Sequence, residues 1–164
     1  MRPRLALVPG EPAGIGPELV VRALRQEFDA ELVVFGDAAA LQRAARALSL
    51  PLELHRAGEA PASPRSTGIV DIPHPMAAAF GTPEPANAAS VVQALLAAAQ
   101  ACVEGTCHGI VTGPVHKAAI NDGGIAFTGT TGLLAAHAGR EVVMMLANDI
   151  VRVALLTVHL PLRA

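Results

Sequence analysis

Short runs of apolar residues alternate with longer amphipathic stretches along the first part of the chain. Arg4–Val8 and Leu32–Phe35 are apolar runs bounded by turn residues, which is typical of buried strands. Between them, Pro17 suits the first turn of a helix that we expect to continue to about Phe28. The side chains expected to face the core from this helix are those of Leu19, Val20, Ala23 and Leu24.

The same rhythm continues with less regular spacing. Asp37 is placed as the N-cap of a helix through Leu48. The segment 51–85 contains seven prolines and is predicted to be a loop region with short strands at 52–54 and 69–72. The remaining predicted elements are a helix over 86–103 that ends before Gly105, a strand over 109–112, and two apolar runs, 142–146 and 151–158, that could form a hairpin around Asn148-Asp149.

The composition agrees with a layered α/β/α fold around a mostly parallel sheet. Apolar residues make up 52% of the chain while aromatic residues make up only 2%, so Val, Leu, Ile and Ala must form the core. Parallel strands buried on both faces favour such residues. The 164 residues fit one domain of ordinary size, which we assign to positions 1–164.

Charge and cysteine content exclude several classes of partner. The net charge is −2, there is no basic cluster, and Trp and Tyr are absent, so we expect no nucleic-acid binding. Cys102 and Cys107 form no CxxC pair and are interpreted as reduced thiols of a cytoplasmic protein. The apolar stretch from Ser90 to Val103 contains two glutamines, and we expect no membrane segment.

Two loops that follow predicted strands could bind a ligand. The segment from Pro9 to Pro17 has three glycines and three prolines, and it is either an anion-binding loop or a structural tight turn. Its spacing matches neither GxGxxG nor the Walker A loop. His116 and Lys117 end the second loop, where they are either proton donors and anion anchors or ordinary solvated residues. Neither is assigned as the general base, and the catalytic residue is unknown.

Two further segments carry candidate chemistry. Thr128, Thr130 and Thr131 surround Gly129 at a predicted helix start, and this pattern favours a plain N-cap over a phosphate site. His159 follows a very apolar strand, a position suited to a metal ligand or general base. A catalytic zinc site usually has about three protein ligands, so one histidine does not make a metal site.

These segments together resemble 4-hydroxythreonine-4-phosphate dehydrogenases. The shared stretches are Pro-Gly-Glu-Pro-Ala-Gly-Ile-Gly-Pro-Glu at 9–18, Thr-Gly-Pro-Val-His-Lys at 112–117, Phe-Thr-Gly at 127–129, Val-Met-Met-Leu-Ala at 143–147 and His-Leu-Pro-Leu at 159–162. The resemblance covers essentially the whole chain but only about the first half of a usual family member.

The resemblance implies a fold and an activity. It implies an isocitrate/isopropylmalate dehydrogenase-like fold, a homodimer, and NAD-dependent oxidation and decarboxylation of 4-phosphooxy-L-threonine in pyridoxal 5'-phosphate (vitamin B6) synthesis. A divalent metal (zinc, magnesium or cobalt) would polarise the reacting oxygen. His159 matches the first of three metal-binding histidines, and the other two belong to the half of the family pattern that the chain does not cover.

The family pattern differs from the chain at the substrate-binding turn. The usual Thr-Gly-His-Thr-Glu is here Thr-Gly-Thr-Thr-Gly at 128–132. Thr131 keeps the substrate-binding threonine, Thr130 occupies the position of a substrate-binding histidine, and Gly132 replaces the acid. Two alternatives therefore stay open: a paralogue that acts on another hydroxy acid or a dihydrodiol, and a non-catalytic truncated binding domain.

Overall fold

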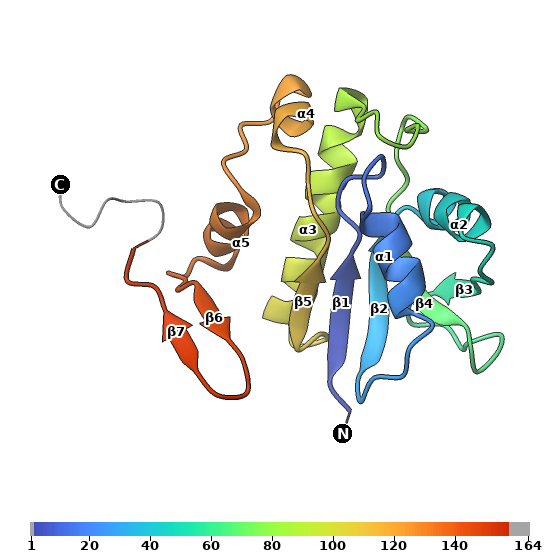
Figure 1. Ribbon diagram of the computed structural model, residues 1–164, viewed down its shortest axis with the longest axis horizontal. Helices are drawn as coiled ribbons and strands as arrows, with labels where there is room; N and C mark the ends of the chain where they lie inside the picture. The colour runs from blue at the N-terminus through green and yellow to red at the C-terminus, as the bar shows by residue number, and fades with distance from the viewer. Residues whose placement is uncertain (1, 158–164) are drawn as a thin grey trace.

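A parallel sheet forms the centre of the molecule. The computed structural model describes residues 2–157 and contains a five-stranded sheet in the order β3-β4-β2-β1-β5, in which every neighbouring pair is parallel (Figure 1). The strands are β1 (Arg4–Val8), β2 (Glu31–Gly36), β3 (Leu54–Arg56), β4 (Thr67–Asp71) and β5 (Gly109–Thr112).

Helices cover both faces of this sheet. α1 (Gly16–Ala23) and α2 (Ala38–Ala47) pack on one face, and α3 (Ala88–Val103) packs on the other behind a short 3-10 turn, η1 (Pro85–Asn87). Successive strand residues point to opposite faces. Leu7 accordingly joins the α1 and α2 layer, whereas Ala6 and Val8 join the α3 layer. The predicted α/β/α layering is confirmed.

The first helix is shorter than predicted. α1 ends at Ala23 rather than near Phe28, and Leu19 is 50% exposed although it was expected in the core. The buried positions include Pro17, Val20 and Val21, so the stripe that faces the sheet is centred about 150° around the helix from Leu19. Beyond Leu24 the residues are mostly polar, and no apolar stripe holds a further turn against the sheet.

Most other predicted boundaries agree to within a few residues. Asp37 is the N-cap of α2, as predicted, and its side chain accepts a hydrogen bond from the Ala40 amide. β3 starts two residues later than predicted, and β4 starts two residues earlier. β5 has its predicted bounds. Gly105 has a positive φ of 76° just past α3, as expected of a helix-ending glycine.

One described stretch, Pro85–Val103, is long and apolar enough to cross a membrane by length and composition alone. Half of it is buried in the fold, where α3 packs against β1, β2 and β5. A core helix of an α/β layer has these same properties, so the stretch is weak evidence for a membrane span.

The chain after β5 forms a second region beside the sheet. It comprises α4 (Lys117–Asp122), which the sequence did not predict, α5 (Thr130–Ala138), β6 (Met145–Ala147) and β7 (Arg152–Ala154). α5 lies against α3, and the antiparallel hairpin β6–β7 extends away from the sheet (Figure 1). The predicted hairpin is confirmed, with shorter strands and a turn in which the Asn148 side chain accepts from the amides of Ile150 and Val151.

Candidate functional site

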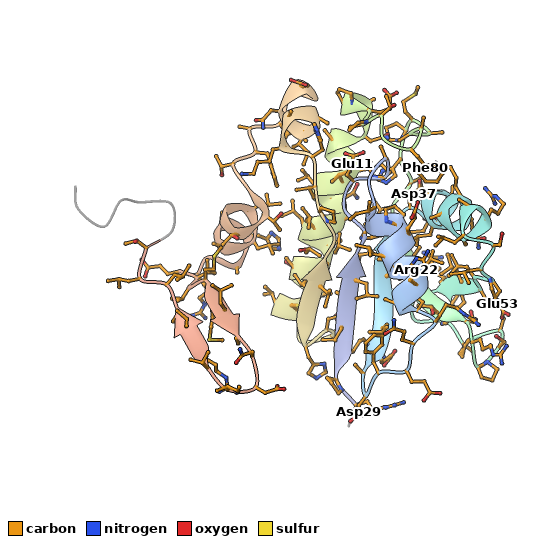
Figure 2. All side chains as sticks on the ribbon, viewed as in Figure 1. Glu11, Arg22, Asp29, Asp37, Glu53 and Phe80 are labelled. Carbon is orange, nitrogen blue, oxygen red and sulfur yellow. The ribbon has the colours of Figure 1, made fainter. Side chains whose placement is uncertain are left out.

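The loops singled out by the sequence gather at the carboxyl ends of the parallel strands. Figure 2 shows Glu11, Asp37 and Phe80 near this edge, whereas Asp29 lies at the opposite edge. β1 lies between β2 and β5 in the sheet. The connection from β1 to β2 runs through α1 on one face of the sheet, and the connection that enters β5 runs through α3 on the other face. Ligands of open α/β sheets bind at such a switch point, so the loops after β1 and β5 occupy the expected place.

Glycines in these two loops allow close contact between backbones. A β-carbon on Gly10, whose φ is +81°, would lie 2.3 Å from the carbonyl oxygen of Pro114. A β-carbon on Gly16 or Gly113 would lie 1.7 or 2.1 Å from the carbonyl oxygen of Pro9. No side chain fits at those distances. The glycines therefore lock the loop after β1 against the loop after β5.

Several backbone amides of the glycine-rich loop already have protein partners. The Glu11 amide donates to the Pro114 carbonyl (2.9 Å), and the Gly14 amide donates to the Glu11 carbonyl (3.0 Å). The buried Glu11 carboxylate accepts from the Ala13 amide at 3.0 Å. A phosphate-cradling loop needs free N–H groups. Of the two alternatives for this loop, the geometry supports the structural turn, and the loop does not fit a pyrophosphate cradle.

A buried polar network that the sequence analysis did not predict lies beside the glycine-rich loop. One oxygen of Asp37 accepts from the Ala40 amide (2.5 Å) and the other from the His74 amide (2.6 Å). The Ser90 hydroxyl donates to the Asn87 carbonyl (2.9 Å), so it accepts from Nδ1–H of His74 (2.7 Å). Burial lowers the pKa of His74. The network ties the loop after β4 to α2 and α3.

Arg43 on α2 contacts both the glycine-rich loop after β1 and the loop after β4. Its Nη2 donates to the Pro12 carbonyl (3.1 Å), and its guanidinium lies 5.4 Å from the centre of the Phe80 ring. The Gly81 amide donates to the Ala13 carbonyl (2.8 Å). Nothing in the amphipathic pattern of the helix distinguishes Arg43 from a solvated arginine, so this role could not be predicted from the sequence.

The loop after β5 ends in a capped short helix. His116 is the N-cap of α4, and its Nδ1 accepts from the Ala119 amide at 3.1 Å. This hydrogen bond uses the Nδ1 lone pair of His116, so that atom is not free to accept a substrate proton. Lys117 is the first residue of α4 and its side chain is exposed.

Asn121 joins this helix to the start of α5. Its Nδ2 donates to the carbonyls of Lys117 (2.8 Å) and Phe127 (3.0 Å), and its Oδ1 accepts from the Phe127 amide (3.1 Å). Lys117 Nζ lies 3.8 Å from the position that a β-carbon on Gly129 would take. The segments 112–117 and 127–131 are thus brought together, as a shared site requires.

The threonines at the start of α5 do not cap the helix. The N-cap residue is Gly129, and no side chain makes a capping hydrogen bond. The prediction of a hydroxyl N-cap is therefore wrong, because the cap position falls on the glycine between the threonines. Thr130 is partly exposed and Thr131 is exposed. Their predicted role in substrate binding stays a prediction.

The predicted metal ligand, His159, lies outside the described residues. Within residues 2–157 there is no group of three or more His, Cys, Asp or Glu side chains placed to hold a metal ion. The described part of the chain therefore does not by itself fit a metal centre.

A hollow lies at the opposite edge of the sheet from the loops after β1 and β5. It is an open space of about 1200 Å³ lined by residues at the amino ends of the strands, among them Arg4, Glu31 and Thr67. His55 lines it and its Nδ1 lies 2.7 Å from the Ser66 hydroxyl. The candidate site remains at the carboxyl edge, where the loops after β1 and β5 meet.

Comparisons with known proteins agree on one family. The family model described as "Pyridoxal phosphate biosynthetic protein PdxA" matches residues 28–164. A 4-hydroxythreonine-4-phosphate dehydrogenase of Stenotrophomonas maltophilia is 57% identical over 99% of the chain and 50% of its own length. The chain thus spans about half the length of the curated relatives it matches.

Solved structures of similar fold extend this result. A crystal structure of a 4-hydroxythreonine-4-phosphate dehydrogenase from Burkholderia phymatum matches 98% of the chain and 51% of its own chain, with a TM-score of 0.89 and 27% identity. A terephthalate 1,2-cis-dihydrodiol dehydrogenase from Burkholderia xenovorans matches 92% of the chain and 46% of its own, with a TM-score of 0.72 and 29% identity.

Proposed function

Because the chain belongs to the pyridoxal phosphate biosynthetic protein PdxA family, we propose that it is the N-terminal half of a 4-hydroxythreonine-4-phosphate dehydrogenase. The proposed reaction is the NAD-dependent oxidation, with decarboxylation, of 4-phosphooxy-L-threonine in pyridoxal 5'-phosphate synthesis. The observation that carries this proposal is 57% identity to a protein of that name over 99% of the chain.

The fold is consistent with this proposal. The chain has the α/β layers of isocitrate dehydrogenase-like proteins, with its candidate site at the carboxyl edge of the parallel sheet. We propose that residues 1–164 are the N-terminal α/β region of the enzyme and that the second half completes the site. We also propose a cytoplasmic homodimer for the full-length protein.

The residues of the proposed site have distinct roles. We assign substrate binding to Thr130 and Thr131, whose hydroxyls stand at the start of α5 outside any capping hydrogen bond. His159 is proposed as one ligand of a divalent metal, with the other ligands supplied by the second half. Residues 2–157 do not fit a metal centre or a pyrophosphate cradle by themselves.

A second candidate function has its own support. The chain is 29% identical to a dihydrodiol dehydrogenase of solved structure, and 27%, 30% and 29% identical to three solved 4-hydroxythreonine-4-phosphate dehydrogenases, one of them described as putative. It also has Thr130 and Gly132 where the family pattern has histidine and glutamate. A paralogue that oxidises a non-phosphorylated hydroxy acid or a dihydrodiol would not need a cation at position 130.

The decisive experiment measures NADH formation by the intact gene product that contains this chain. Separate reactions contain 4-phosphooxy-L-threonine, unphosphorylated 4-hydroxy-L-threonine and a cis-dihydrodiol, each with NAD and a divalent metal. The proposal expects the highest kcat/KM with the phosphorylated substrate. Turnover of the dihydrodiol alone would establish the second function. No turnover of any of them would favour a non-catalytic binding domain.

A further inference from the structure

The backbone of Lys117 is held beside the proposed substrate site, and its side chain is exposed. It is the single lysine among the 164 residues. Asn121 binds both the Lys117 carbonyl and the backbone of Phe127, so the start of α4 and the approach to α5 are held together. Lys117 Nζ lies 3.8 Å from the β-carbon position of Gly129, the residue immediately before Thr130.

No acidic side chain of residues 2–157 forms an ion pair with this ammonium group. The amino end of a helix carries a partial positive charge that repels a neighbouring cation. The first turn of α5 contains no acidic residue, and no side chain caps it. The ion pairs of residues 2–157 are Arg2–Asp29 and Arg4–Glu31, and neither involves Lys117. An anion between Lys117 and α5 would be stabilised by both.

Packing does not require the glycine at position 132. A β-carbon there would contact only the Thr128 hydroxyl oxygen, at an ordinary 3.5 Å. A glycine inside a helix costs about 1 kcal/mol relative to alanine, so its presence calls for another reason. Without an acid at 132, Lys117 has no ion-pair partner among residues 2–157, and its charge is available to a ligand. The hydroxyls of Thr130 and Thr131 can donate hydrogen bonds but carry no charge.

We propose that Lys117 is a specificity-determining residue, which supplies to the anionic group of the substrate the positive charge that Thr130 lacks. This inference rests on the proposed function, because it takes the substrate site to lie at Thr130 and Thr131. The ligand class that it selects is a small molecule with a phosphate or a comparable compact anion. Lys117 binds the substrate in this scheme and takes no part in proton transfer.

The first test separates binding from turnover in the intact gene product. Lys117→Met should raise KM for 4-phosphooxy-L-threonine about tenfold or more, since hydrogen bonds to charged groups contribute about 1.5–3 kcal/mol, while kcat changes by less than about threefold. Lys117→Arg should retain most of the affinity. Lys117→Met combined with Thr130→His should recover the low KM, because a cation is restored at the same anion.

The matched control is Arg140→Met, which removes an exposed cation at the other end of α5. It should leave KM unchanged. An unchanged KM in Lys117→Met, an equal effect in Arg140→Met, or no recovery by Thr130→His would each overturn the inference.

A second measurement does not depend on turnover. The rate of chemical acetylation of Lys117 is followed by mass spectrometry of the peptide that contains it, in inorganic phosphate and in chloride of equal ionic strength. Phosphate should slow acetylation at least about threefold, since it accepts hydrogen bonds from the ammonium form, which has no lone pair for attack, and fills the space around Nζ. Equal rates in the two salts would overturn the inference. If the wild-type protein fails to oxidise 4-phosphooxy-L-threonine but phosphate protects Lys117, the proposed function fails and the anion site stands.

Discussion

The sheet region (residues 2–112) and the region after β5 (residues 113–157) both contain many apolar side chains, but they bury them to different extents. In the sheet region, Leu95 and Val34 are fully buried between helices and strands. After β5, α5 buries none of its residues completely, and Leu146 and Ile150 are 62% and 95% exposed. Among residues 2–157, β6 and β7 pair only with each other. The chain spans half the length of its relatives, so we expect these side chains to be covered in the full-length protein.

The largest expected difference between the regions concerns core stability. Leu95→Ala should lower the free energy of unfolding by about 3 kcal/mol, because it removes a fully buried side chain. Leu146→Ala should change it by less than about 0.5 kcal/mol, because that leucine is 62% exposed. Urea denaturation followed by circular dichroism measures both. Equal losses would show that the hairpin is buried in solution and would remove the distinction between the regions.

A smaller difference is expected between the helix starts. Asp37→Ala should lower the free energy of unfolding by about 2 kcal/mol, since Asp37 caps α2 and also accepts from the His74 amide. Thr128→Ala is the matched change near the uncapped start of α5 and should cost less than about 0.5 kcal/mol. Thermal unfolding of the two variants compares them. A larger loss for Thr128→Ala would mean that α5 contributes more to stability than its exposure indicates.

The smallest expected effect is a pH dependence within the sheet region. Burial lowers the pKa of His74 in the folded state below its unfolded value of about 6.5. Between the two values the unfolded chain binds more protons. The contribution of His74 to stability is therefore fully present above about pH 6.5 and is lost as the pH decreases toward the lowered pKa of the folded state. His74→Asn keeps an N–H donor for Ser90 and should flatten this part of the curve. An unchanged slope in the variant would assign the pH dependence to other groups.

The sheet was predictable because its strands are short, apolar and separated by clear turn residues. β1 and β5 have their predicted bounds, and the capping aspartate of α2 is a local signal. Leu19 was misplaced because three consecutive apolar residues allow two adjacent stripes, and only the position of the sheet selects one. α4 was missed because its cap is a histidine rather than the usual Ser, Thr, Asp or Asn.

The candidate site was less predictable because its parts are distant in sequence. The order of strands and loops placed 112–117 at the carboxyl edge, which is confirmed. The close contact between Gly10 and Pro114 could not be predicted, because Pro114 belongs to a loop that is distant in sequence. Asn121 has no periodic or motif signal, yet it fixes the distance between Lys117 and α5. The roles of Thr130, Thr131 and His159 stay predictions.

The pairing of β1 with β5 has a consequence for protein synthesis. Arg4 and His108 are hydrogen-bonded although they are 104 positions apart. At about 5–20 residues per second, β1 leaves the ribosome on the order of 5–20 s before its second partner strand exists. During that interval one edge of β1 is open to pairing with another nascent chain. The other edge of β1 is covered earlier, because β2 pairs with it and Glu31 of β2 forms an ion pair with Arg4.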